Sequence, residues 1–298
     1  MTPEASFIVP TYRRAAVLEV AVPLFLGQRT DADFEVIVVS DGPDPETDAV
    51  MARLAAPNLH YVALPENAGP STARNRAIGM AKGRILLFVD DDSLIKPDFL
   101  ARHLAHHAGH DDRLVTGPIL DVSAPPEDME NPPPAGIFDR HFNPLPTGNA
   151  SVARAHVTAV GGFDEGFREY GWEDPEFCAR LMRRPLQTRF ERAAPIYHWK
   201  PPAANRSLAA RLRRELARGR NGARFHAKHP TLSVALQTKR WAGYRALDRL
   251  LDPVLRLDRR MLEVLAGGPE PGGLMAVLLL AHAEIEGGRG REVPENGA

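Results

Sequence analysis

The stretch Ile85-Leu86-Leu87-Phe88-Val89-Asp90-Asp91-Asp92 decides the fold class of this chain. Five apolar residues between Gly83 and three aspartates indicate a buried strand, so the carboxylates leave the sheet at its C-terminal end. Ligands bind at this edge in open α/β sheets. Three neighbouring carboxylates repel one another unless a cation lies among them, and hard oxygen ligands suit Mn²⁺ or Mg²⁺. The cluster predicts a divalent metal that holds a phosphorylated ligand, with an acidic turn that caps a helix as the alternative.

Strands and helices alternate around this stretch. The segments expected to form them are, in order, strand 6–10, helix 15–26, strand 34–40, helix 46–54, strand 60–63, helix 70–81 and strand 85–89. Continuous apolar strands joined by helices predict an α/β fold with a mostly parallel, Rossmann-like central sheet and flanking helices. Right-handed crossovers bring the carboxyl ends of the strands to one edge. Residues 123–134, rich in Pro and acidic side chains, break this pattern and predict a connecting loop.

Composition places the chain among ordinary globular proteins. Its 298 residues are 44% hydrophobic and 25% charged, and Cys178 is the single cysteine, which fits a reducing compartment. The N-terminus has no basic region before an apolar one, and the longest apolar run, 274–283, is shorter than the ~20 residues that span a bilayer. We therefore expect a cytoplasmic protein.

Charge divides the chain into an acidic body and a basic tail. Residues 200–260 hold 16 Lys or Arg against 4 Asp or Glu, whereas residues 1–199 hold 19 against 28. We expect a first domain at 1–204 and a basic helical extension at 205–298, where Leu208, Leu212 and Leu216 recur at helical spacing. The helix argues against nucleic acid as the partner. Two readings of its arginines, which include Arg211, Arg213 and Arg214, stay open: a solvated face, or peripheral contact with a membrane.

A second acidic site lies in Tyr170-Gly171-Trp172-Glu173-Asp174-Pro175. Trp172 offers an indole on which a sugar ring stacks, and a carboxylate beside it can take a hydroxyl proton. The alternative is that Asp174 only caps the helix that Pro175 opens. Farther on, His198 ends the apolar run Ile196-Tyr197-His198-Trp199 and is a reasonable further metal ligand.

Taken together, these motifs resemble the family 2 glycosyltransferases of the GT-A fold. The resemblance rests on Phe7–Tyr12, Val38–Gly42, Asn67–Asn75, Asp90–Asp92 and Trp172–Asp174, in this order. The stretch from Gly162 to Asp174 also resembles the C-terminal module of galactosyltransferases. Each motif alone is weak, whereas the ordered set is specific.

The resemblance implies transfer of a hexose from a nucleotide diphosphate sugar to an acceptor hydroxyl, with inversion at the anomeric carbon. Asp174 would be the general base, and Glu173 would contact the acceptor or the donor sugar. Asp92 would bind Mn²⁺ or Mg²⁺ with help from His198. The nucleotide-sugar contacts would be Pro10, Thr11, Tyr12, Asp41, Arg74, Asp90, Asp91 and Trp172.

Partners follow from the same resemblance. The donor is expected to carry UDP in preference to GDP or dTDP, and the acceptor is a glycan or a lipid-linked molecule. Gln237, Arg240 and Trp241 match a pattern of processive polysaccharide synthases, but the chain has no membrane helices for a polymer channel, so we expect non-processive transfer. Two alternatives stay open: a binding module without activity, and a phosphohydrolase with an aspartate nucleophile.

Overall fold

The computed structural model describes residues 2–136, 145–200 and 207–291 and divides the chain into two compact units. The first unit holds Met1–Arg168 and Asp174–Pro201, and the second holds Glu169–Glu173 and Pro202–Ala298. The second unit thus takes five residues that directly precede Asp174. The boundary expected between residues 204 and 205 lies outside the described residues.

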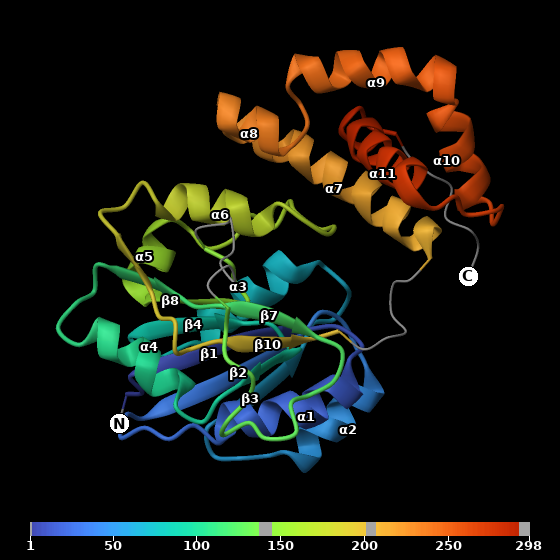
Figure 1. Cartoon of the computed structure of the whole chain (residues 1–298). Coiled ribbons are helices and arrows are strands. Elements are labelled where there is room, and N and C mark those ends of the chain that lie inside the picture. Colours follow the sequence, from blue (N-terminus) through green and yellow to red (C-terminus); the bar gives the residue numbers. More distant parts are fainter. Residues whose placement is uncertain (1, 137–144, 201–206, 292–298) are drawn as a thin grey trace. The chain divides into compact units, whose positions relative to one another are not determined.

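A seven-stranded sheet forms the centre of the first unit (Figure 1). Across the sheet its strands are β3 (Leu59–Ala63), β2 (Phe34–Ser40), β1 (Ala5–Thr11), β4 (Ile85–Val89), β8 (Asn149–Ala153), β6 (Arg113–Thr116) and β9 (Gln187–Phe190). Only β8 runs against its neighbours, so the mostly parallel sheet is confirmed. Because β8 is antiparallel, its first residues lie beside the last residues of β4, with Asn149 paired to Val89.

Helices cover both faces of this sheet (Figure 1). They are α1 (Ala15–Leu26), α2 (Pro45–Arg53), α3 (Pro70–Met80), α4 (Phe99–His107), α5 (Arg154–Ala159) and α6 (Glu173–Leu181). Alternate side chains of β1 enter two cores, since Phe7 and Val9 pack with α1 whereas Ile8 packs with α3. The helix at 15–26 and the strands at 34–40 and 85–89 have the expected bounds, and residues 123–134 form neither helix nor strand.

A smaller sheet, not anticipated from the sequence, places His198. It pairs β10 (Ile196–Trp199) with β5 (Ser93–Ile95) on one side and with β7 (Ile119–Val122) on the other. His198 lies opposite Ser93 in the antiparallel pairing and opposite Asp121 in the parallel one. This register brings the histidine next to the residue that follows the aspartate triplet.

Five helices make up most of the second unit (Figure 1). They are α7 (Leu208–Lys228), α8 (Leu232–Gln237), α9 (Ala242–Leu255), α10 (Leu257–Leu265) and α11 (Gly273–Gly288). Leu208, Leu212 and Leu216 are buried in its core, as their spacing predicts. Among the described residues, no helix is long and apolar enough to cross a bilayer.

The apolar face of α9 differs from its expected role. Periodicity predicts one face formed by Trp241, Tyr244, Leu247 and Leu251. The helix is present, but Trp241 is 47% and Leu247 55% exposed, whereas Asp248 is buried on the inner side. Leu251 packs against the core of the second unit as expected, together with Leu255, whereas much of the remaining apolar surface of the helix is turned outward.

Candidate active site

Asp91 ties the end of β4 to the turn after β1. Its two carboxylate oxygens accept hydrogen bonds from the Thr11 hydroxyl at 2.7 Å and from the Arg14 guanidinium at 2.9 Å. Burial raises the pKa of Asp91 to about 7, although Arg14 acts in the opposite direction. Asp91 is 4% exposed, so this carboxylate is turned into the protein, and its expected contact with ribose or sugar stays a prediction.

Asp92 and His198 meet, as the metal prediction requires. Nε2 of His198 lies 3.0 Å from Oδ1 of Asp92, and Arg14 lies 2.7 Å from the other oxygen. Nδ1 of His198 lies 3.1 Å from Asp121. Burial opposes ionisation of Asp92, but His198 and Arg14 outweigh it and hold the pKa of this carboxyl below its usual value.

These donors fit a divalent cation. Asp90, Asp92 and His198 each offer a ligand atom, and the three atoms lie within 4.8 Å of one another. Oδ1 of Asp92 is buried and accepts no hydrogen bond of normal geometry within the described part of the chain. Two carboxylates and an imidazole are a donor set that Mn²⁺ accepts. Asp90, assigned to the sugar from the sequence, is therefore also a candidate ligand.

Arg74 joins the triplet to the second acidic site. Its guanidinium donates to Asp90 at 3.0 Å and lies 3.6 Å from Oδ1 of Asp174. The other oxygen of Asp174 accepts a hydrogen bond of 2.5 Å from the Thr147 hydroxyl. Burial raises the pKa of Asp174, against the effect of Arg74. No described contact makes Asp174 a cap of α6, which begins one residue earlier.

The residues expected to bind the nucleoside lie at the ends of β1 and β2. Pro10 and Thr11 close β1, and Tyr12, 41% exposed, follows them. Asp41 follows β2 and accepts hydrogen bonds from the backbone N–H groups of residues 68 and 69 at 2.8 to 3.0 Å. Among the described contacts, none links Asp41 to the triplet. The roles assigned to these residues remain predictions.

Trp172 and Glu173 belong to the second unit. Trp172 is 7% exposed and packs on Phe225 of α7, with ring centroids 5.8 Å apart, while Arg218 lies over its ring at 4.8 Å. Its indole is thus already covered by protein, and stacking on a sugar stays a prediction. Glu173 is partly buried at the start of α6.

Arg14, Thr147 and Asp121 are the residues that sequence reasoning missed. Arg14 lies three residues after the end of β1 and pairs with Asp91 and Asp92, a position that the strand pattern could have marked. Thr147 and Asp121 lack such a signal, because they reach the site through the antiparallel β8 and through the smaller sheet.

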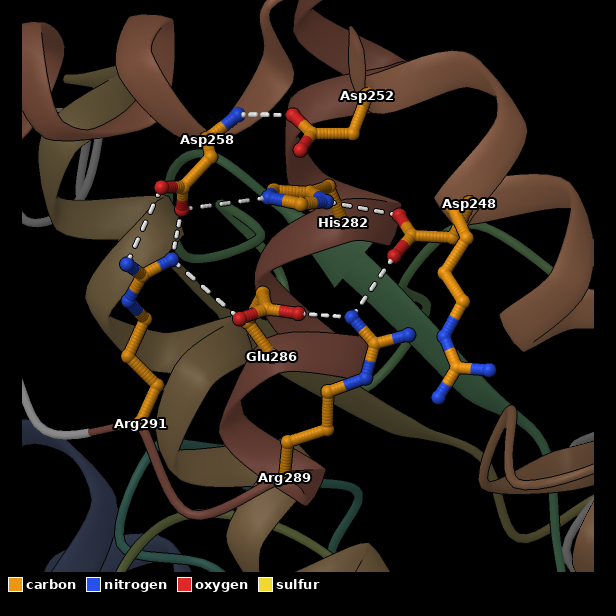
Figure 2. A pocket seen from close by; sticks show the side chains of 8 residues that line it. Asp248, Asp252, Asp258, His282, Glu286, Arg289 and Arg291 are labelled. Atoms are coloured by element: carbon orange, nitrogen blue, oxygen red, sulfur yellow. Dashed lines mark hydrogen bonds and ion pairs between the residues drawn. The ribbon is translucent and has the colours of Figure 1, made fainter.

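A second charged cluster lies in the second unit, around a cavity of about 280 Å³ (Figure 2). Its main side chains are Asp248, Asp258, His282, Glu286, Arg289 and Arg291. Nδ1 of His282 lies 2.7 Å from Asp248, and each carboxylate of this set faces an arginine. Since the arginines already supply positive charge, we assign the cluster to the packing of α9, α10 and α11.

Asp90 to Asp92 follow β4 at the carboxyl edge of the mostly parallel sheet, where open α/β sheets bind ligands, and Arg14, Arg74 and His198 contact them. The family model for glycosyl transferase family 2 matches residues 6–167, more than half of the chain. The chain therefore belongs to glycosyl transferase family 2. A second model, described as the N-terminal domain of galactosyltransferase, matches residues 138–200. The resemblance drawn from the motifs is confirmed, and the chain is a glycosyltransferase.

Curated relatives carry related names. The chain is 26% identical over 262 residues to the glycosyltransferase YfnE of Bacillus subtilis. This match covers 69% of this chain and 67% of YfnE. It is also 26% identical over 238 residues to the chondroitin synthase of Escherichia coli. That match covers 66% of this chain but 35% of the synthase, so the chain spans about a third of this relative.

Solved structures of glycosyltransferases share the fold. Staphylococcus aureus TarS, residues 1–349, superposes with a TM-score of 0.58 at 19% identity and covers 96% of this chain and 89% of its own. The mannosyltransferase PcManGT of Pyrobaculum calidifontis, solved with GDP-Man and Mn²⁺, superposes with a TM-score of 0.57 at 21% identity, over 95% and 86% of the two chains. The expected GT-A fold is confirmed.

Proposed function

We propose that this glycosyltransferase moves a hexose, with inversion, from a nucleotide diphosphate sugar to a hydroxyl of a glycan or lipid-linked acceptor, one sugar at a time. One observation carries the proposal: Arg74 bridges Asp90, of the proposed cation-binding set, and the partly buried Asp174. PcManGT was solved with GDP-Man and Mn²⁺, and GalNAc-T7 with UDP, GalNAc and Mn²⁺, which supports a nucleotide-sugar donor. Among nucleotides, we propose UDP ahead of GDP and dTDP.

Asp90, Asp92 and His198 would hold Mn²⁺ or Mg²⁺. When bound, such a cation neutralises the charge that develops on the departing diphosphate. Arg74 supports the same charge from the protein side, because its guanidinium is permanently positive and buried. Asp174 takes the proton of the acceptor hydroxyl as that oxygen bonds to the anomeric carbon, and the nucleoside diphosphate leaves from the opposite face. A single displacement of this kind inverts the anomeric centre.

Binding of UDP with Mn²⁺ tests the metal assignment. Because the buried Asp92 pairs with Arg14 and His198, Asp92→Asn keeps the size of the side chain and removes only its charge. We expect the variant to lose at least about tenfold in Mn²⁺-dependent UDP affinity by calorimetry, while UDP without metal binds as weakly as to the native chain. Asp111→Asn, which removes an exposed carboxylate paired with Arg84, is the control and should bind normally. Equal affinities for all three proteins would exclude Asp92 as a ligand.

We also propose that the chain contacts anionic membranes, through α9 and not through the arginines of α7. Leu247, Leu250 and Val254 of α9 are 55%, 72% and 77% exposed. The two acidic residues of α9 are engaged inside the unit, whereas Arg249 and Arg256 are exposed. The helix thus presents apolar surface and positive charge together, the combination that favours an anionic bilayer over a neutral partner.

The arginines on α7 have contacts of their own. Arg213 donates to the carbonyl of Leu265 at 3.2 Å, and Arg214 lies over the ring of Tyr170 at 4.2 Å. If Arg213 and Arg214 bound a membrane, they would have to give up these contacts within the protein. We therefore propose α9 as the membrane-facing element.

A further inference from the structure

The chain that leads into Asp174 is held by α7. Asn221 of this helix is 5% exposed, and its side-chain amide donates to the carbonyl of Glu169 at 2.9 Å and to that of Gly171 at 3.0 Å. The two bonds use both hydrogens of the amide. They fix two backbone carbonyls of one turn, which we call the base-leading turn (residues 169–173).

Side chains of the base-leading turn also pack on α7. Glu169 accepts a hydrogen bond of 2.8 Å from Arg220, and Tyr170 lies beneath Arg214. Trp172 stacks on Phe225 with 29° between the ring planes. The indole Nε1 lies where a side chain at Gly222 would stand, 3.1 Å from the position of its Cβ. Residues 169–172 of the turn are therefore each in contact with one helix.

The backbone of this turn needs such support. Gly171 has a φ of 96° and Trp172 a φ of 72°, both in the left-handed region. A bulky residue rarely adopts this conformation, and it persists only where the surroundings impose it. Released from α7, Trp172 would relax toward negative φ and change the direction in which the chain enters α6.

We infer that α7 positions the catalytic base, with Asn221 as the main positioning residue. The inference rests on the proposed role of Asp174, and the peptide bond between residues 173 and 174 is sufficient to carry the effect. Asp174 is otherwise held only by Thr147 and Arg74 among the described contacts. A displacement of about 1 Å at a reacting group can lower the rate by ~10², so a loosened turn should reduce transfer without affecting the donor site.

Asn221→Ala tests this inference in the full chain, with Arg213→Ala as the matched control. Both variants lose side-chain donors from α7 to backbone carbonyls of the same unit, but Arg213 donates to Leu265 and not to the base-leading turn. Hydrogen exchange should quicken by about tenfold or more at the amides of residues 169–174 in Asn221→Ala, while those of β4 stay protected. With a nucleotide sugar that the native chain turns over as substrate, the kcat of Asn221→Ala should be at least about tenfold lower than that of the native chain. The KM for the nucleotide sugar should be unchanged.

The outcomes separate this inference from the proposed function. Unchanged exchange in Asn221→Ala, or quicker exchange with unchanged kcat, overturns the positioning role. A native chain that turns over no nucleotide sugar overturns the proposed function instead, and exchange then still decides whether Asn221 holds the turn. If Asn221→Ala does not fold, Arg214→Ala removes the contact with the 52%-exposed Tyr170, the one side-chain contact of Arg214 within the described part of the chain, and should show the same pattern more weakly.

Discussion

Asp174 is the side chain on which proton transfer depends in the proposed reaction. Asp174→Asn keeps an oxygen for the Thr147 hydroxyl but cannot take a proton. We expect transfer to fall by ~10² or more, with the affinity for UDP and Mn²⁺ unchanged, because the proposed ligands of the metal and contacts of the nucleotide do not include Asp174. Steady-state transfer and calorimetry are the measurements, and Asp111→Asn again serves as the control. A variant that transfers sugar at the native rate would leave Asp174 a structural partner of Thr147 and Arg74.

The pH dependence of transfer checks the same residue. Burial raises the pKa of Asp174, so in the native chain the group holds its proton at pH values where an exposed aspartate has lost it. A base must be unprotonated, and the rate should therefore rise with pH through this raised pKa and level off above it. The residual rate of Asp174→Asn should lack that limb. A native profile that stays flat down to the usual pKa of aspartate would argue against Asp174 as the base.

Two glycines, Gly219 of α7 and Gly287 of α11, allow these helices to pack closely. A Cβ at Gly219 would overlap the backbone oxygen of Glu284, and one at Gly287 would overlap that of Leu216, so the two helices approach at backbone contact. Gly219→Ala should destabilise the second unit by ~1–3 kcal/mol, because α7 and α11 must separate. Denaturant unfolding followed by fluorescence measures this loss.

The control for this prediction lies in the first unit. Gly79 of α3 is exposed and has nothing near the position of a Cβ, so Gly79→Ala should stabilise by ~0.5–1 kcal/mol through helix propensity alone. If Gly219→Ala is as stable as the native chain, the helices are not in backbone contact in solution.

For the whole chain, the proposed membrane contact predicts salt-sensitive binding to anionic vesicles. Each basic residue near such a surface contributes ~1 kcal/mol, weakened by salt, and the exposed apolar side chains of α9 add to it. Replacing Leu247, Leu250 and Val254 by Ser should abolish co-sedimentation, since these side chains are already exposed and their loss should spare the fold. Changing Arg211, Arg213 and Arg214 to Gln should reduce it far less.

Vesicles of neutral lipid are the matched control for charge. The native chain should sediment with anionic vesicles at low salt and remain in solution with neutral ones. If it stays in the supernatant with both, the apolar face of α9 serves a protein partner or a second copy of the chain, and the membrane proposal fails.

The local pattern of apolar and polar residues was sufficient to predict the order of strands and helices in the first part of the chain. The bounds of α1, β2 and β4 follow from apolar periodicity, and the placement of Asp90 to Asp92 at a carboxyl edge follows from β4 alone. The ordered motifs were also sufficient for the family, because their residue types and sequence follow the chemistry of one kind of site. The strand and helix bounds depend on neighbours close along the chain, and the family depends on the order of the motifs, so neither requires knowledge of contacts in space.

Contacts between distant segments depend on pairings that no local pattern encodes. The meeting of His198 with Asp92 follows from the register of β10 with β5, and that of Thr147 with Asp174 from the antiparallel insertion of β8. The burial of Trp172 against Phe225 required the second unit to fold around the base-leading turn. The physical reason is that register, strand direction and helix packing are set by the summed burial of side chains far apart in sequence. A stretch of sequence can therefore supply the chemical groups of this site, but only the folded chain brings them within bonding distance.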